Sequence, residues 1–124
     1  MKKILIIGLL FVSLGLFTAC KNDNPSVIKV FVRSASNELV EGAKVIIIGD
    51  VNSNPETMSW VDTIVTNNSG FAYFNMKEFY EAAGAEENPV AYFDIIAKTA
   101  TKEATGYIRS RVHTTAVETV FLPN

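Results

Sequence analysis

The sequence has very few residues of the kinds that build disulfides, metal centres or histidine-based active sites. Its 124 residues include one cysteine, Cys20, and one histidine, His113. A disulfide needs two cysteines, a zinc-type cluster needs several cysteine or histidine ligands, and an active site needs several convergent titratable groups. We therefore expect no catalytic residue, no metal site and no cofactor, and we do not expect an enzyme.

A block of basic residues is also missing. Lysine and arginine number 11 against 13 aspartates and glutamates, which gives a formal net charge of −2. Domains that bind nucleic acid cluster lysine and arginine, because these side chains attract the phosphate backbone. We therefore expect no nucleic-acid partner.

What the sequence does have at its start is an apolar run from Ile4 to Phe17, directly after Lys2 and Lys3. A helix that spans a bilayer needs about 20 apolar residues, whereas the apolar part of a cleaved export signal has roughly 7 to 15. We interpret residues 1–19 as a signal peptide. Its removal leaves 11 − 2 = 9 basic residues against 13 acidic ones, a net charge of −4.

The end of this segment, Leu16-Phe17-Thr18-Ala19-Cys20, resembles the lipobox of bacterial lipoproteins. In that family a small residue precedes the cysteine whose sulfur receives diacylglycerol; leucine usually stands where this chain has Phe17. The resemblance implies that Cys20 is the lipid attachment site and the first mature residue. The alternative is an ordinary secretory signal that leaves Cys20 as a free thiol. Polar residues up to Pro25 predict a lipidated tether over residues 20–26.

From residue 27 to 124 the pattern predicts one all-β domain. Apolar residues alternate with other residues in short runs between turn residues, and this period of two is typical of strands. In one run Ala91, Phe93, Ile95 and Ala97 share a face. We predict seven strands, near residues 28–33, 43–48, 58–66, 71–74, 90–98, 105–112 and 116–122. About seven strands in about 100 residues favour an immunoglobulin-like or transthyretin-like sandwich.

One segment has the period of a helix. Four apolar residues fall at i, i+3, i+4 and i+7 and so share one helix face: Met76, Phe79, Tyr80 and Ala83. Asn75 can cap the first turn, Glu78 stands where a capping-box carboxylate reaches back, and Gly84 suits the C-terminal end. We predict a short helix that covers an open end of the sandwich.

Two stretches resemble the carboxypeptidase-regulatory-like, or transthyretin-like, β-sandwich of bacterial envelope proteins. Residues 39–47, LVEGAKVII, are similar to that family's hairpin, and residues 66–74, TNNSGFAYF, to its turn and following strand. The resemblance implies the sandwich fold, with Gly70 in a backbone state closed to other residues and with Ala72 and Phe74 pointing inward. Leu39 stands near the place of the family's usual proline. The matched motifs are structural and imply no activity.

Aromatic side chains favour one alternative role, because sugar rings stack on aromatic faces. Four residues are candidates for a glycan-binding surface: Trp60, Tyr73, Tyr92 and Tyr107. The competing interpretation is that they pack the sandwich or cover its outer faces. Asp62-Thr63-Ile64 resembles an Asp-Thr-apolar O-glycosylation acceptor, so Thr63 is a candidate modification site; the simpler interpretation is an exposed strand edge.

Two weaker patterns involve charged residues. Lys29, Asp94 and Asn124 have positions loosely suited to the lysine–asparagine isopeptide bond of some related sandwich domains. On the strand near 105–112, Arg109 and Arg111 share a face with Tyr107, and Glu118 is a candidate cross-strand partner for this face.

Together these features predict a lipid-anchored β-sandwich with a structural or protein-interaction role in the bacterial cell envelope. The alternative is a glycan-binding surface lipoprotein. The expected partners are the membrane, reached through the N-terminal lipid, and envelope proteins or glycans. We expect the outer membrane, on either its periplasmic or its surface face.

Overall fold

The computed structural model describes residues 22–124. The predicted signal peptide over 1–19 and the predicted lipid attachment site Cys20 lie outside the described residues. Seven strands and one helix follow each other along the described part: β1 Val27–Arg33, β2 Lys44–Gly49, β3 Val61–Val65, β4 Phe71–Asn75, α2 Lys77–Ala83, β5 Val90–Lys98, β6 Glu103–Arg111 and β7 Thr115–Phe121. The prediction of an all-β, seven-stranded sandwich with one short helix is confirmed.

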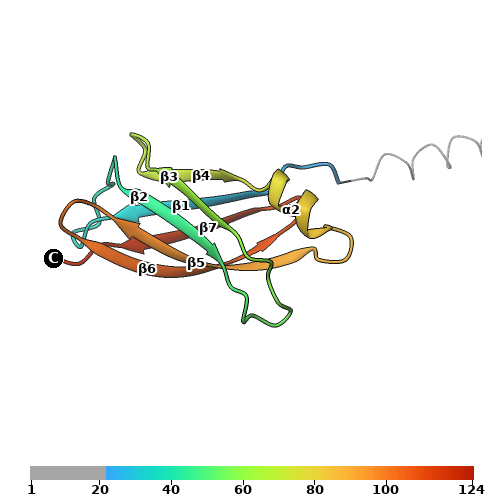
Figure 1. The fold of residues 1–124 in the computed structure, drawn as a ribbon. Coiled ribbons are helices and arrows are strands. Elements are labelled where there is room, and N and C mark those ends of the chain that lie inside the picture. The colour runs from blue at the N-terminus through green and yellow to red at the C-terminus, as the bar shows by residue number, and fades with distance from the viewer. Residues whose placement is uncertain (1–21) are drawn as a thin grey trace, which may run out of the picture.

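The strands form two sheets that face each other (Figure 1). In the three-stranded sheet, β1 lies between β4, which runs antiparallel to it, and β7, which runs parallel. The four-stranded sheet has the order β3-β2-β5-β6 with antiparallel neighbours throughout. Consecutive strands β6 and β7 therefore belong to different sheets. Glu118 on β7 pairs with Val30 and not with β6, so our expectation that it lies across from Arg109 and Arg111 is wrong.

The core lies between the sheets and is built from every second residue of each strand. Along β1, Ile28, Val30 and Val32 are fully buried, while the residues between them point outward and are half-buried. The predicted faces of β4 and β5 are confirmed, because the side chains expected to share a face are all buried: Ala72, Phe74, Ala91, Phe93, Ile95 and Ala97. Burial of apolar surface is thus the main stabilising term, as expected for a sandwich in which no disulfide can form.

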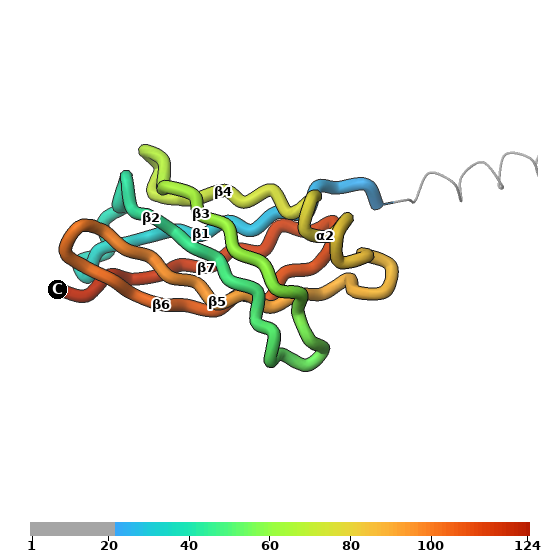
Figure 2. The backbone as a smooth tube through the Cα atoms, viewed as in Figure 1, coloured from blue at the N-terminus to red at the C-terminus, as the bar shows by residue number. Residues whose placement is uncertain are grey.

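Helix α2 closes one end of the sandwich, as predicted, and the tube in Figure 2 shows it beside the start of the described chain. Phe79 and Tyr80 are buried, and the Phe79 ring packs edge-on against Phe93 with centroids 5.1 Å apart. Gly84 ends the helix at φ 78°, and its N–H donates to the Tyr80 carbonyl. Such a left-handed end favours glycine, so the predicted stop at Gly84 is confirmed.

The helix starts one residue later than the capping pattern indicates. β4 extends to Asn75, so the N-terminal cap position is Met76. The Asn75 side chain still accepts a hydrogen bond from the Lys77 N–H at 3.0 Å, as a cap would. The third helical position becomes Phe79, so Glu78 makes no capping-box bond, and that prediction is wrong.

Candidate functional site

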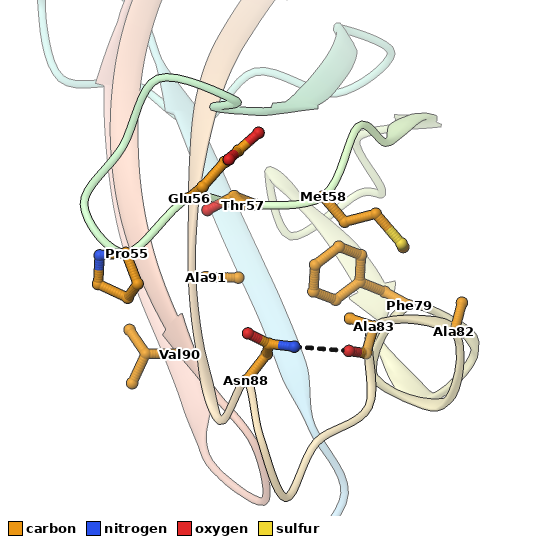
Figure 3. Close-up of a pocket in the computed structure, with 10 residues that line it drawn as sticks. All are labelled: Pro55, Glu56, Thr57, Met58, Phe79, Ala82, Ala83, Asn88, Val90 and Ala91. Atoms are coloured by element: carbon orange, nitrogen blue, oxygen red, sulfur yellow. Dashed lines mark hydrogen bonds between the residues drawn. The ribbon is translucent and has the colours of Figure 1, made fainter.

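A cavity of about 430 Å³ lies between the β2–β3 loop, helix α2 and the start of β5 (Figure 3). Apolar side chains including Met58, Phe79 and Val90 form much of its wall. Two of its polar side chains are already bonded: Asn88 Nδ2 donates to the Ala83 carbonyl at 2.8 Å, and Thr57 Oγ1 accepts from the Tyr92 N–H at 2.9 Å. The arrangement can hold a small apolar group, and it presents no nucleophile paired with a base.

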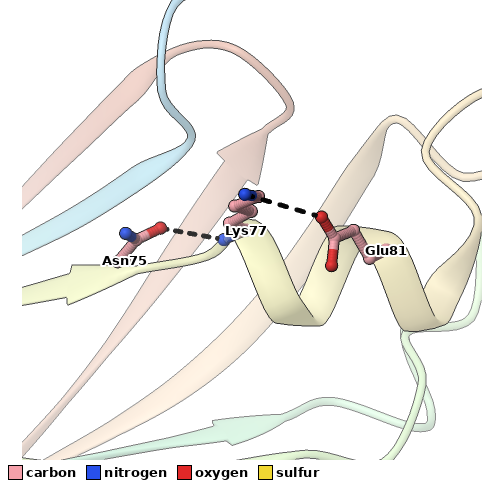
Figure 4. Close-up of polar contacts among 3 residues, drawn as sticks. All are labelled: Asn75, Lys77 and Glu81. Atoms are coloured by element: carbon pink, nitrogen blue, oxygen red, sulfur yellow. Dashed lines mark hydrogen bonds and ion pairs between the residues drawn. The ribbon is translucent and has the colours of Figure 1, made fainter.

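A second cavity, of about 470 Å³, lies where the N-terminal segment meets helix α2. Lys77 and Glu81 stand on its wall and form an i,i+4 ion pair of 4.0 Å, while Asn75 Oδ1 accepts a hydrogen bond from the Lys77 N–H (Figure 4). Their side chains are 75% and 65% exposed, and exposed pairs of this kind contribute about 0.3–0.5 kcal/mol. These contacts therefore fasten the helix and are not a reactive centre.

The N-terminal segment is bonded to the same end of the sandwich. The Ser26 carbonyl accepts from the Met76 N–H at 2.9 Å, and Ser26 Oγ accepts from the His113 N–H at 2.7 Å. The Val27 N–H donates to the Thr114 carbonyl at 3.0 Å. The exposed His113 ring places Nδ1 2.7 Å from the Asn24 carbonyl. His113 is thus a loop residue that holds the start of the domain.

The structure separates the four aromatic candidates for a glycan surface. Tyr92 on β5 and Tyr107 on β6 lie together on the outer face of the four-stranded sheet, with nearly parallel rings at 22° and centroids 6.1 Å apart. Tyr73 lies on the outer face of the other sheet. Trp60 is half-buried and packs edge-on against Phe79 at 5.5 Å. A single surface containing all four is therefore ruled out, whereas the tyrosine pair remains a candidate.

Asp50 is hydrogen-bonded to Tyr107 of that pair, and the sequence did not predict this contact. Tyr107 Oη donates to Asp50 Oδ2 at 2.7 Å, although the two residues are 57 positions apart in the chain. This hydrogen bond, together with desolvation and the negative charges of Asp50 and Asp94, raises the pKa of Tyr107 to about 12. The Asp50 carbonyl in turn accepts from Ser53 and Thr57, which orders the β2–β3 loop. The Tyr107 hydroxyl is therefore held in one place.

The structure also locates the candidates for O-glycosylation and for an isopeptide bond. Thr63 is exposed on β3, an edge strand of its sheet, so its O-glycosylation stays a prediction. Lys29 projects from the outer face of one sheet and Asp94 from the outer face of the other, which makes the isopeptide arrangement wrong. Trp60 Nε1 is buried and has no hydrogen-bond partner among the described residues.

Residues 22–124 were also compared with the requirements of a metal site and of a membrane-spanning helix. Within this range no group of three or more His, Cys, Asp or Glu side chains is placed to hold a metal ion. No helix of the described part is both long and apolar enough to cross a bilayer.

No family model and no curated protein matches the chain. Parts of several solved structures are similar to it, and three of them show the range of these similarities. The Bacillus anthracis TIE protein has a TM-score of 0.53 at 13% identity, over 82% of this chain and 17% of that one. Wild-type catechol 1,2 dioxygenase of Acinetobacter radioresistens has a TM-score of 0.52 at 10% identity, over 82% of this chain and 53% of that one. Chlorocatechol 1,2-dioxygenase from Pseudomonas putida has a TM-score of 0.51 at 13% identity, over 85% of this chain and 63% of that one.

This chain therefore spans less than two thirds of each of these proteins. At such identities the likeness shows the sandwich fold alone, and fold does not imply function.

Proposed function

We propose that the chain is a lipid-anchored β-sandwich of the bacterial cell envelope, with a structural or protein-interaction role. The observation that carries the proposal is the order of segments at the N-terminus: two lysines, an apolar run, small residues and then Cys20. One acyl chain gives only marginal membrane binding, whereas several chains on one cysteine hold a protein firmly. The outer membrane is the proposed location.

The way the domain begins supports this proposal. Asn24, Ser26 and Val27 are all hydrogen-bonded to the helix end of the sandwich. The chain between Cys20 and Asn24 spans at most about 14 Å even when fully extended. A lipid on Cys20 therefore keeps the folded domain close to the bilayer, where it can contact other envelope components.

Contacts between the two motif segments support the resemblance to the carboxypeptidase-regulatory-like, or transthyretin-like, sandwich. Thr66, at the start of the second motif, is buried; its Oγ1 donates to the Val40 carbonyl at 2.7 Å and accepts from the Ala43 N–H at 2.9 Å. Gly42 and Gly70 have φ values of 79° and 78°, the left-handed region that favours glycine. The residues that carry the resemblance thus form one structural unit.

Metabolic labelling with a clickable fatty acid tests the anchor. The full chain expressed in a bacterial host should take up the label and partition into detergent, and Cys20→Ala should lose both properties. Thr18→Ser keeps a small residue before the cysteine and serves as the matched control, which should still be labelled. A labelled Cys20→Ala variant, or an unlabelled parent chain, would contradict the proposal.

Glycan binding is a second candidate function, and the Tyr92–Tyr107 pair favours it. Half-exposed, nearly parallel rings offer apolar faces to sugar C–H groups, and the exposed Asp94 and Arg109 flank them in register. On a glycan array, Tyr107→Ala should abolish any binding of the parent chain. Tyr73→Ala, on the opposite sheet, should leave it unchanged. Binding insensitive to Tyr107→Ala would remove this candidate.

A further inference from the structure

The outer face of the three-stranded sheet carries a row of exposed apolar side chains. Strand register places Phe31 beside Phe71, and Lys29 between Tyr73 and Val117. Tyr73 is 47%, Val117 54% and Phe121 55% exposed. The ring centroids of Phe31 and Phe71 lie 5.3 Å apart, and both side chains are half-buried. Thr119 lies beside Phe31 and Arg33 beside Phe121, so exposed apolar side chains alternate here with polar and basic ones. Several large apolar side chains left exposed on one face mark a surface that contacts something else.

The charges on this face all have the same sign. Lys29 Nζ lies 4.3 Å from the centroid of Phe71 and 5.9 Å from that of Phe31, so an ammonium group stands over the aromatic rings. Arg33 is the next outward-facing residue of β1 after Phe31, and it lies beside Phe121. No outward position of the described strands β1, β4 and β7 holds an aspartate or glutamate.

Other surfaces of the domain differ in charge. The outer face of the four-stranded sheet mixes both signs, with Lys44 and Lys98 beside Glu103 and Asp94 nearby. The helix end carries acidic side chains, Glu78 and Glu81 among them. Because the mature chain has a net charge of −4, a face with cations and no carboxylates stands out as the one suited to anionic lipid headgroups.

The chain enters the domain at this same sheet. β1, its central strand, begins directly after the bonded residues Asn24 and Ser26, at the end of the sandwich that carries α2 (Figure 1). With Cys20 at most about 14 Å from Asn24, the bilayer that holds the lipid lies within reach of the whole face. Aromatic and basic side chains together suit the boundary between headgroups and acyl chains.

We propose that the outer face of the three-stranded sheet lies on the bilayer in which the Cys20 lipid is anchored. Phe31, Phe71, Tyr73, Val117 and Phe121 contact the lipid interface, and Lys29 and Arg33 pair with anionic headgroups. The four-stranded sheet, with its Tyr92–Tyr107 pair, then faces away from the membrane and is free for partners. This pose rests on the proposed lipid anchor.

Site-directed fluorescence tests the pose with two valines of equal exposure on opposite sheets. Val117→Cys and Val65→Cys, at 54% and 55% exposure, are prepared in the acylated full-length background and labelled with bimane. The acylated proteins are placed in vesicles of phosphatidylethanolamine and phosphatidylglycerol that contain a headgroup-level nitroxide quencher. Label at position 117 should be quenched several-fold more than label at position 65, with a blue-shifted emission.

Label stoichiometry separates failure of the pose from failure of the anchor. Cys20 is the only natural cysteine, so an acylated variant takes one bimane per chain and an unacylated one takes two. One label with equal quenching at 117 and 65 overturns the pose and leaves the anchor standing. Protection of position 117 in native envelopes but not in pure lipid vesicles also overturns it, because the face would then cover a protein or glycan.

A second pair guards against a local effect of either substitution. Tyr73→Cys and Tyr107→Cys have similar exposure, 47% and 45%, and lie on the same two outer faces. The first should be quenched and the second should not. Adding Lys29→Glu and Arg33→Glu to Val117→Cys should reduce its quenching several-fold, whereas Lys44→Glu and Lys98→Glu should leave it unchanged. Insensitivity to the first charge reversal overturns the headgroup contact.

Discussion

Tyr80 Oη on helix α2 donates a hydrogen bond of 2.9 Å to Ser110 Oγ on β6, and both side chains are buried. This bond ties the helix that closes the sandwich to the last strand of the four-stranded sheet. Burial raises the pKa of the Tyr80 phenol, while the hydrogen bond to Ser110 and the positive charge of Arg109 act in the opposite direction. The helix end is thus fixed by a polar contact as well as by apolar packing.

Removing one partner of this bond should destabilise the domain. Tyr80→Phe leaves the buried Ser110 hydroxyl unpaired, which typically costs about 1–3 kcal/mol. Urea unfolding should show this loss in the free energy of unfolding. The double variant Tyr80→Phe/Ser110→Ala should recover part of it, because neither polar group is then left alone. A double variant whose loss equals the sum of the two single losses would argue against the bond.

The Phe79 side chain is expected to be the most sensitive apolar position of the helix. It is 1% exposed, and its ring packs against Trp60, Tyr80 and Phe93 at 5.0–5.5 Å. Truncation of a buried phenylalanine to alanine costs about 3–5 kcal/mol. Phe79→Ala should therefore lower stability by this amount and alter the fluorescence of Trp60, the sole tryptophan. Glu78→Ala, on the exposed side of the helix, should change neither.

Alanine substitutions at two glycines should distinguish the cost of backbone strain from the cost of steric overlap. Gly42 and Gly70 both have positive φ, but a Cβ at Gly42 meets nothing within 4 Å, whereas one at Gly70 lies 2.9 Å from Leu39 Cβ. Gly42→Ala should cost about 1–3 kcal/mol from the left-handed backbone alone. Gly70→Ala should cost more, as measured by thermal unfolding. Equal losses of stability at the two positions would mean that Leu39 can move away from the added Cβ at no cost.

The ionisation of Tyr107 gives a pH-dependent signal. Its pKa of about 12 lies above the ordinary value of 10.0, so the folded state favours the neutral phenol. The resulting stabilisation is complete below pH 10 and is lost as the pH rises toward 12. Ultraviolet difference titration should show two late tyrosines, because the pKa of Tyr80 is also raised, and Tyr107→Phe should remove one of them. Asp50→Asn should move the pKa of Tyr107 toward 10. Asp94→Asn should produce a smaller shift, since its charge is a lesser cause.

Much of the fold is visible in the sequence because burial on one face imposes a period of two. β5 occupies Val90–Lys98, as its alternation predicted. Gly84 ends the helix because the chain turns there with positive φ. β3 is shorter than predicted and begins at Val61. The Trp60 carbonyl still accepts from the Gly49 N–H of β2, but the chain just before it turns into the loop, where the Thr57 N–H donates to the Asp50 carbonyl and Thr57 Oγ1 accepts from the Tyr92 N–H. Alternation alone does not report such long-range bonds.

The candidate surfaces were harder to predict because they depend on which strands become neighbours. Tyr92 and Tyr107 meet only because β5 pairs with β6, and Asp50 reaches Tyr107 from a distant loop. The outward alternation of Lys29, Phe31 and Arg33 was visible in the sequence, but Phe71 joins it only through the pairing of β1 with β4. Strand order follows from the packing of the whole chain and not from any one segment.

The most direct test of the account is mass spectrometry of the intact mature protein and its N-terminal peptide, purified from membranes of a bacterial host. A lipid anchor on Cys20 predicts a chain that begins at Cys20 and is heavier than residues 20–124 by a thioether-linked diacylglycerol and an amide-linked acyl group. A mature chain that begins elsewhere, or one with a free thiol at Cys20, would contradict it.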